Sequence, residues 1–387
     1  MISIIKMFFW ISVFIIFWAN IGYQLSIILL GKIIKRKNTK KAGYCPTVTV
    51  MVVAHNEEEI ILDKLMNLEK IDYPKEKMSI LIASDNSTDQ TNEIVENYIQ
   101  EKSIINVRLF KVNNRMGKTN AQNEAQKTVT TEYLIMTDAN SMLDSLAVRE
   151  LVSSFSTENI SYVTGKLEYI NANESKTSSN ESFYWNLDLK IREIESDIQT
   201  ITAGNGALYA VRNCDYHDFS PIESHDSSMP LYYSLRGKRA IANHEAIAYE
   251  KAGENTGDEF NRKVRMNRML LSHIVPTLEI LNFFKVKWFT YFYVGHRTSR
   301  YLLWLVHLIL VVTNFYLSFS STTYAYILFF HILILLSAIF QHVIKTKNTL
   351  LNLIYYYCIT VLAQYVGIWN ILTGKTRPFW EKAESTR

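Results

Sequence analysis

Cysteine is scarce in this sequence: Cys45, Cys214 and Cys358 are the only three among 387 residues, and they form no CxxC pair. This spacing argues against a disulfide framework or a zinc site and favours a reducing compartment. A strong charge excess is also missing, since the formal net charge is +4. Because no basic patch is interleaved with aromatic residues, nucleic acid is not an expected partner. The basic residues lie beside apolar segments, which indicates a membrane surface.

One long apolar run lies near the beginning of the chain, from Met7 to Leu30. It exceeds the roughly 20 residues that span a bilayer core as a helix. The alternative, a cleaved signal peptide, is disfavoured by the length and by the lack of a small-x-small cleavage site. Six of the next eleven residues are Lys or Arg, whereas only Lys6 precedes the run. The positive-inside rule therefore predicts a cytoplasmic central domain at the inner (plasma) membrane.

Three further apolar runs near the end of the chain predict a multi-pass protein. They are Leu302–Ser320, Tyr324–Ile344 and Leu350–Leu372. Counting these spans places the C-terminal tail outside, but its four basic residues favour the cytoplasmic side. The two rules disagree, and a terminal segment that is re-entrant or lies in the membrane interface would reconcile them.

The segment Phe260–Arg300 mixes apolar with basic residues. Part of it fits an amphipathic helix in the headgroup layer. A helix that lies on the domain surface and packs against the domain's own core fits the pattern equally well.

Short apolar runs alternate with helical patterns between residues 46 and 160. The predicted strands are Val48–Ala54, Ser79–Ala83, Val107–Val112 and Tyr133–Met136. Two helices are expected to begin at the capping boxes Asn56/Glu59 and Ser87/Gln90. A third helix is expected over Gly117–Lys127. This alternation predicts an α/β domain whose strands pair in parallel through right-handed crossovers.

Polar clusters follow the carboxyl ends of three predicted strands, where such sheets bind ligands. These clusters are His55-Asn56-Glu57, Asp85 and Asp138-Ala139-Asn140. Oxygen atoms of Asp138 and Asn140 suit a divalent metal, Mg²⁺ or Mn²⁺, which would neutralise a departing nucleotide diphosphate. Lys118 lies at a predicted helix start, where backbone N–H groups also favour phosphate. A single Asp after a strand is usually only a helix cap, so the interpretation depends on the ordered set.

Seven motifs occur in order between residues 46 and 270: AHNEEE, SDNSTDQT, MGKTNAQNEA, TDAN, VTGKLEY, GNGALYAVR and HDSSMPLYYSLRGKRAIANHEAIAYE. With these seven motifs in this order, the chain resembles family-2 glycosyltransferases with the GT-A fold. It is most similar to the membrane-bound branch related to cellulose, hyaluronan and poly-N-acetylglucosamine synthases. The resemblance implies a Rossmann-like nucleotide-sugar-binding domain with transmembrane helices at both ends.

The resemblance and the apolar runs together divide the chain into four expected parts. These are an N-terminal membrane anchor with its basic flank (1–42), a cytosolic GT-A domain (43–258), an amphipathic interfacial segment (259–300), and a C-terminal region of about three spans with the tail (301–387).

The resemblance also implies roles for single residues. Asp226 matches the catalytic base, and Arg265 matches the arginine that neutralises the departing diphosphate. Asp138 matches the first residue of the DxD element, which holds the diphosphate and its metal, while Asn140 replaces the second Asp. The remaining positions expected to bind the nucleotide-sugar are Ala54, Asn56, Glu57, Asp85 (at the nucleoside), Lys118 and Arg262.

Two departures from the family pattern bear on the product and on the base. Processive members carry Gln-x-x-Arg-Trp, where this chain has Arg262 and Met266 in place of Gln and Trp. Met266 lacks an aromatic face for a sugar, which argues against polymer synthesis. The basic cluster around Arg262 is alternatively a headgroup-binding stripe. His225 either tunes Asp226, contacts the acceptor, or is a solvated loop histidine.

The sequence therefore favours an inverting transferase that moves a sugar, expected from a UDP-sugar, to a membrane-associated lipid or glycan in envelope or surface-polysaccharide assembly. One alternative is a processive synthase that extrudes its polymer. Another is a non-catalytic nucleotide-binding subunit of a membrane complex.

Overall fold

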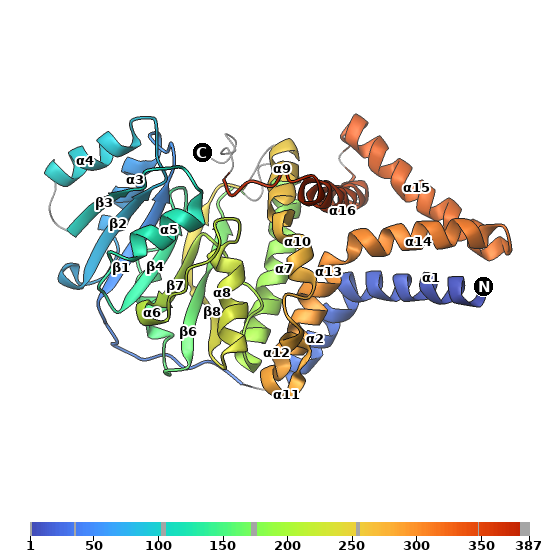
Figure 1. The fold of residues 1–387 in the computed structure, drawn as a ribbon, viewed down its shortest axis with the longest axis horizontal. Coiled ribbons are helices and arrows are strands. Elements are labelled where there is room, and N and C mark those ends of the chain that lie inside the picture. Colours follow the sequence, from blue (N-terminus) through green and yellow to red (C-terminus); the bar gives the residue numbers. More distant parts are fainter. Residues whose placement is uncertain are drawn as a thin grey trace.

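The computed structural model describes residues 2–34, 36–101, 106–171, 176–252, 256–346 and 348–379. A sheet domain occupies one end of the molecule, and long apolar helices extend from the other (Figure 1). The strands are β1 (Val48–Ala54), β2 (Met78–Ser84), β3 (Asn106–Lys111), β4 (Tyr133–Asp138), β5 (Met142–Leu143), β6 (Ile160–Tyr169), β7 (Leu208–Arg212) and β8 (Arg239–Glu250).

The eight strands form one mixed sheet in the order β3-β2-β1-β4-β7-β6-β8-β5. β3, β2, β1 and β4 pair in parallel, as predicted, and their bounds differ from the predicted ones by at most two residues. β7 runs antiparallel to both β4 and β6. In the parallel half, Ala54 pairs with Ser84 and Val53 with Asp138, so the three polar clusters emerge at one edge.

Helices cover both faces of the sheet because alternate strand residues point to opposite sides. Val50 and Val52 face one core cluster with Ile61, whereas Met51 faces another with Ala121. The helices of this domain and its flank are α3 (Ile61–Glu69), α4 (Thr91–Glu101), α5 (Lys118–Gln126), α6 (Ala147–Ser153), α7 (Lys176–Ile198), α8 (His225–Leu235) and α9 (Thr256–Met266).

Both predicted capping boxes are wrong. α3 begins only at Ile61, because Asn56 has a positive φ of 56° and turns the chain before the helix. The side chain of Asn56 instead accepts a hydrogen bond from the Thr88 N–H at 2.8 Å. At the start of α4, Asp89 rather than Ser87 accepts from the Thr91 N–H, at 3.0 Å. A hydrogen bond to the neighbouring turn therefore replaces the expected cap of α3, whereas Asp89 caps α4 locally.

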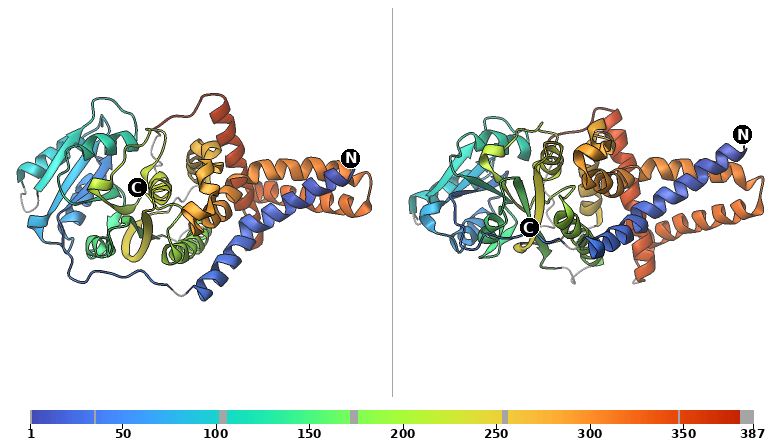
Figure 2. Two further views of the ribbon diagram at one scale, coloured as in Figure 1. Left: turned by 60° about the horizontal axis from the view of Figure 1, so that its bottom comes forward. Right: turned by 90° about the horizontal axis from the view of Figure 1, so that it is seen from below.

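The long apolar helices are α1 (Ile2–Phe17), α2 (Tyr23–Ile33), α14 (Leu303–Ser318), α15 (Thr322–Ile344) and α16 (Thr349–Leu372). Among the described residues, Ile2–Ile33, α15 and α16 are long and apolar enough to cross a membrane. α14 passes this test only together with Trp288–Tyr301, from which it is bent by 59°. Figures 1 and 2 show α1, α14 and α15 extending away from the sheet domain, whereas α16 lies across their base.

The amphipathic segment is not one helix. It is divided among the end of α9 and α10 (Leu270–Ile274), α11 (Phe283–Val286), α12 (Trp288–Phe292) and α13 (Ser299–Tyr301), joined by short 3-10 and π-helical turns. Val286, Phe289 and Tyr293 pack against Leu231 and Leu235 of α8. Phe284, by contrast, is 95% exposed. The packing on α8 agrees with the interpretation of helices on the domain surface, whereas a place in the headgroup layer stays a prediction.

The tail after α16 returns to the sheet domain. The Pro378 carbonyl accepts a hydrogen bond from Arg268 at 3.3 Å, and the Arg115 guanidinium lies 4.7 Å from the centre of the Phe379 ring. α16 itself packs on α9, where Tyr356 donates to Glu259 at 3.2 Å. The tail up to residue 379 therefore lies with the sheet domain, and residues 380–387 are outside the described part of the chain.

Candidate active site

Three charged side chains from distant parts of the sequence meet at Gly206. Lys118 is the first residue of α5, Asp138 is the last residue of β4, and Asp226 lies in the first turn of α8. A methyl group placed on Gly206 would lie 3.1 Å from Lys118 Nζ, 3.6 Å from Asp138 Oδ2 and 3.9 Å from Asp226 Cγ. The structure thus brings together two residues expected to bind the donor and the expected base.

Lys118 forms an ion pair with Asp138 and donates to the Gly206 carbonyl at 3.3 Å. Burial lowers the pKa of Lys118, but the carboxylates of Asp138 and Asp226 outweigh burial, and its pKa is raised. The lysine is therefore a fixed positive charge at neutral pH. Its side chain remains 21% exposed and that of Asp138 32% exposed, so a ligand can reach both.

Asp85 is buried beside this site and organises the turn before α5. Its carboxylate accepts from the Met116 N–H at 3.1 Å and from the Gly117 N–H at 2.9 Å. Gly117 has a φ of +92°, and a Cβ there would lie 2.5 Å from the Pro378 carbonyl oxygen. Only glycine fits both the turn and the returning tail. Asp85 thereby fixes the position from which Lys118 enters the site.

The cluster that follows β1 packs against the turn that follows β2. The Ala54 carbonyl accepts from the Asp85 N–H at 2.9 Å, and Glu57 is 7% exposed. The Glu57 N–H donates to Thr91 Oγ1 at 2.7 Å, while Asn56 contacts Thr88. These residues therefore shape the edge of the site next to Asp85.

Two ionisable residues beneath Asp138 were not predicted from the sequence: Lys64, which is buried, and Glu250, which is half-buried. Lys64 has no exposed surface and donates to Thr137 Oγ1 at 3.0 Å and to the Ser141 carbonyl. Glu250 accepts from the Ser141 hydroxyl. Burial lowers the pKa of Lys64 to about 7, whereas burial and the nearby Asp138 raise that of Glu250 to about 7.

Lys64 and Glu250 hold both ends of the turn that carries Asp138 and Asn140. One signal for Lys64 was present in the sequence. It lies on the same helical face as Ile61, Leu65 and Leu68, which are buried, and a lysine inside an apolar stripe needs a buried partner.

The metal-binding residues expected from the sequence, Asp138 and Asn140, lie two residues apart at the end of β4. Asn140 is half-buried, and its side chain makes no hydrogen bond within the described residues. The part of the chain that the structure describes contains no group of three or more His, Cys, Asp or Glu side chains that could hold a metal. The pair fits a Mg²⁺ or Mn²⁺ ion that takes its other ligands from a diphosphate and water, which is usual for Mg²⁺.

Arginines of α9 and the following turn form the opposite wall. Arg262 pairs with the buried Glu259 at 2.6 Å. Burial and repulsion from Arg262 and Arg268 lower the pKa of Arg265 to about 10, and attraction to Asp138 opposes this shift. Arg268 donates to the Glu223 carbonyl at 3.1 Å and interacts electrostatically with Asp226. This wall therefore presents positive charge to the two carboxylates.

The backbone around Asp226 is anchored by the loop that precedes β7 and by α7. Its carbonyl accepts from the Gly204 N–H at 2.8 Å, and the Gly204 carbonyl accepts from Arg192 at 2.6 Å. Arg192 in turn pairs with Asp188 at 2.6 Å. The first turn of α8 also places the Asp226 carboxylate near a helix N-terminus, which stabilises negative charge.

His225 is neither solvated nor directed at an acceptor, and these two sequence interpretations are wrong. It is 1% exposed; its Nδ1 lies 2.9 Å from Gln122 Oε1 and its Nε2 lies 2.8 Å from the Tyr216 hydroxyl. Burial lowers its pKa to about 3. It is a neutral, packed side chain that holds the start of α8 against α5.

Comparison with known proteins decides what kind of domain this is. Residues 49–216 match the family model for glycosyl transferase family 2. The chain carries a family 2 glycosyltransferase domain. This confirms the family expected from the ordered motifs.

The proteins similar to the chain include two curated relatives and one solved structure. It is 27% identical over 202 residues to β-monoglucosyldiacylglycerol synthase of Nostoc sp., covering 51% of this chain and 42% of that protein. It is 24% identical over 287 residues to poly-β-1,6-N-acetyl-D-glucosamine synthase of Staphylococcus aureus, and the match covers 71% of this chain and 66% of that protein. For three curated relatives the match spans only 32% to 42% of their length.

The solved structure is mannosyltransferase PcManGT from Pyrobaculum calidifontis, in complex with GDP-Man and Mn²⁺. It shares 18% identity with a TM-score of 0.71, and the match covers 95% of this chain and 99% of that one. This likeness confirms the expected α/β GT-A fold with apolar helices at both ends.

Gly206 gives the first prediction. We expect Gly206→Val to lower kcat/KM about a hundredfold, because its side chain would push apart Lys118, Asp138 and Asp226. The control is Gly43→Asn, at a position with no heavy atom within 4 Å and a positive φ that Asn tolerates. Equal kcat/KM in Gly206→Val and wild type, measured with the same nucleotide-sugar, would remove Gly206 from the site.

His225 gives a second prediction. Its pKa is about 3 in the folded chain and 6.5 when unfolded, so only the unfolded chain gains the proton as pH falls below 6.5. Between pH 7 and pH 5 the free energy of unfolding should fall by about 2 kcal/mol from this residue. Denaturant unfolding of wild type and His225→Gln at both pH values checks this. An identical pH dependence in the two proteins contradicts it.

Proposed function

We propose that the chain is an inverting glycosyltransferase that moves a sugar from a nucleotide-sugar to a lipid or glycan acceptor at the membrane. The observation that carries this proposal is the meeting of Lys118, Asp138 and Asp226 at Gly206, within a family 2 glycosyltransferase domain. One positive charge and two carboxylates thereby lie within 4 Å of a single point, the position of a Cβ placed on Gly206.

The proposed mechanism uses one displacement. Asp226 accepts the proton of the acceptor hydroxyl while the oxygen attacks the anomeric carbon, and one carboxylate is sufficient for this. Lys118 and Arg265 neutralise the diphosphate as the bond between it and the sugar breaks. A divalent ion held by Asp138 and Asn140, when bound, would supply further positive charge to the diphosphate. Attack opposite the leaving group inverts the anomeric configuration.

The donor and acceptor are proposed from the relatives. One relative is named as a synthase of monoglucosyldiacylglycerol and another as a synthase of poly-β-1,6-N-acetyl-D-glucosamine. Their names support a lipid or a glycan as acceptor, in envelope or surface-polysaccharide assembly, and a UDP-sugar remains our proposed donor. We propose that the GT-A domain ends near residue 258. Within it, the nucleoside would be bordered by Asp85, Ala54, Asn56 and Glu57.

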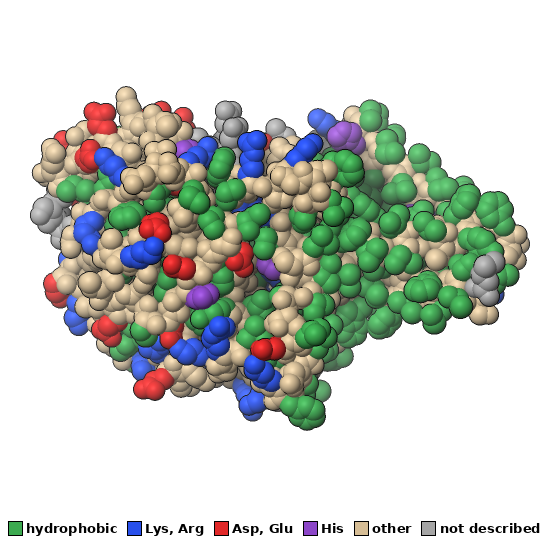
Figure 3. Space-filling view, viewed as in Figure 1, with side chains coloured by type: hydrophobic (Ala, Val, Ile, Leu, Met, Phe, Trp, Pro, Cys, Tyr) green, Lys and Arg blue, Asp and Glu red, His purple; other side chains and the backbone are tan. Residues whose placement is uncertain are grey.

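We place the catalytic domain on the cytoplasmic side of the inner (plasma) membrane. Figure 3 shows hydrophobic side chains covering the helices that project from the domain, while charged side chains gather over the domain. In this arrangement α1, α14 and α15 cross the membrane and α16 lies in its interface. The tail then remains on the cytoplasmic side, in contact with Arg268 and Arg115, so charge and span count agree.

Polymer synthesis is the alternative within enzymes. Met266, at the position of the sugar-stacking Trp, is 62% exposed and offers no aromatic face. We therefore expect one or a few sugars per acceptor. Gel analysis of labelled product from the purified chain checks this, and long polymer made by the chain alone would favour the processive alternative.

Asp226→Asn tests the mechanism. We expect turnover to fall by about 10²–10⁴-fold, because the amide cannot accept the proton. Binding of UDP-sugar, measured by isothermal titration calorimetry, should change little. Loss of turnover with retained binding also distinguishes an enzyme from a non-catalytic nucleotide-binding subunit, in which the substitution would change no activity. Full turnover in the variant would remove Asp226 from the mechanism.

Metal removal tests the role of Asp138 and Asn140. Transfer should stop when divalent ions are removed with a chelator and return on addition of excess Mn²⁺ or Mg²⁺. We expect Asn140→Asp to lower the metal concentration that gives half-maximal rate, because it adds a second carboxylate. Undiminished transfer in the chelator refutes the proposed metal role.

A further inference from the structure

A second cavity lies on the membrane side of the catalytic domain, away from the Gly206 site. Its volume is about 550 Å³. It lies where the chain leaving α2, the end of α7, the start of β8 and the turn between α11 and α12 meet. The catalytic mechanism uses none of the residues that line it.

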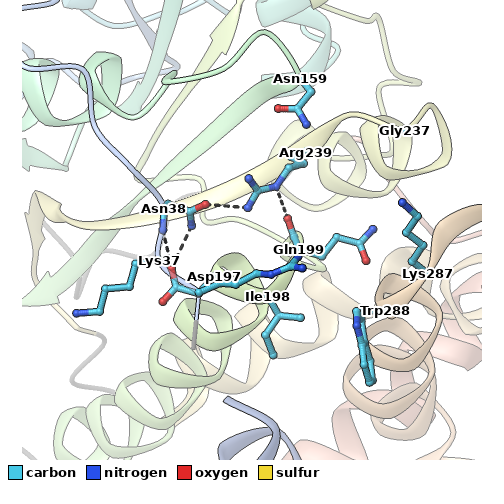
Figure 4. Close-up of a pocket in the computed structure, with 11 residues that line it drawn as sticks. Lys37, Asn38, Asn159, Asp197, Ile198, Gln199, Gly237, Arg239, Lys287 and Trp288 are labelled. Carbon is cyan, nitrogen blue, oxygen red and sulfur yellow. Dashed lines mark hydrogen bonds between the residues drawn. The ribbon is translucent and has the colours of Figure 1, made fainter. Parts of the chain in front are cut away.

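The charge of this cavity is strongly one-sided. Its lining includes four basic residues, Arg36, Lys37, Arg239 and Lys287, and one acidic residue, Asp197. Figure 4 shows Lys37 and Lys287 on opposite sides of the pocket, with Arg239 between them. Burial and the nearby Arg36 lower the pKa of Arg239, while Asp197 opposes this shift. A bound anion would relieve the repulsion between these two arginines.

Arg239 is held in place before any ligand arrives. It donates to the Gln199 carbonyl at 2.6 Å, to Asn38 Oδ1 at 2.7 Å and to the Ser196 carbonyl at 3.0 Å. Figure 4 shows two of these hydrogen bonds. A guanidinium fixed in this way loses little entropy when it binds an anion. The charge is therefore part of a formed pocket, and not only a flexible surface patch.

The wall formed by Lys287 and Trp288 connects the cavity to the membrane interface. Lys287 has a positive φ of 56°, which is uncommon for a residue other than glycine and is enriched at functional sites. Trp288 packs on a cluster that includes Tyr23 and Ile27 of the first membrane helix. On the preceding helix, Phe284 is 95% exposed. Exposed aromatic residues beside basic ones are typical of the headgroup level of a bilayer.

From this pocket and its position we propose that the cavity binds the phosphate of an anionic phospholipid headgroup. The inference rests on the membrane placement proposed above. The bound lipid would tie the exit of α2, the start of β8 and the α11–α12 turn to the membrane surface. It would thereby fix how the catalytic domain sits over its membrane-bound acceptor.

The test measures lipid binding to the full chain in neutral detergent by native mass spectrometry. We expect phosphatidylglycerol to bind about tenfold more tightly than phosphatidylcholine. The variant R36Q/K37Q/K287Q should lose about tenfold or more of its affinity for phosphatidylglycerol. The control K70Q/K111Q/K127Q removes the same charge outside the pocket and should lose less than about twofold.

Equal losses in the two triple variants, or no preference for phosphatidylglycerol in wild type, would overturn the proposal. Inorganic phosphate is a separate arm: if it displaces phosphatidylglycerol at equal concentration, the pocket holds a soluble phosphate and the lipid assignment is wrong. Membrane placement is assayed independently by fractionation. If the chain is recovered in the soluble fraction without detergent, the membrane placement itself is refuted. If the chain still requires detergent but does not prefer phosphatidylglycerol, this inference alone is refuted.

Discussion

The proposed catalytic site depends on one constraint: three charged side chains must share the space that Gly206 leaves open. The ion pair of Lys118 with Asp138 places positive charge beside the carboxylate that follows β4, and Asp226 approaches from the first turn of α8. Because Gly206 lies just before β7, which runs antiparallel to β4, the pairing of these two strands brings the glycine to Asp138. Sheet topology therefore assembles the site.

The loop that precedes β7 also links the sheet domain, through α7, to the apolar helices. Gly204 contacts the backbone of Asp226 and is held by Arg192, which pairs with Asp188. Burial raises the pKa of Asp188, but Arg192, His296 and Arg300 outweigh burial and keep its pKa well below the usual range. A contiguous set of buried hydrogen bonds and ion pairs thus runs from the membrane-side segment to the residue proposed as base.

The N-terminal apolar helix α2 joins this set through Tyr23, which donates to Glu195 at 2.6 Å. His296 lies 2.8 Å from the same carboxylate and 2.9 Å from Asp188. Leaving any of these buried groups without its partner costs free energy, so the apolar helices and the sheet domain are held in one arrangement. The lipid pocket inferred above lies along this junction.

The parallel half of the sheet could be predicted from the sequence because its signals are local. Each strand is a short apolar run, and the residues directly after it, such as Asp85 and Asp138, must lie at the carboxyl edge. Local rules failed at Asn56, where contacts with the next turn replaced the expected cap. Lys64 and Glu250 were missed because their importance comes from burial beneath a turn that is distant in sequence.

Span count and charge disagree about the tail because α16 has the length and composition of a span, yet lies across the base of the other helices. Only its contacts with α9 and the return of Pro378 to Gly117 reveal this. Sequence composition reports whether a helix can enter a membrane, whereas its orientation depends on tertiary packing.

A structure of the full chain bound to a nucleoside diphosphate and Mn²⁺ tests the central claim most directly. The account predicts the diphosphate beside Lys118 and Asp138, with the Asp226 carboxylate facing the space where the sugar would lie. A diphosphate bound elsewhere, or an Asp226 carboxylate turned away from that space, would contradict it.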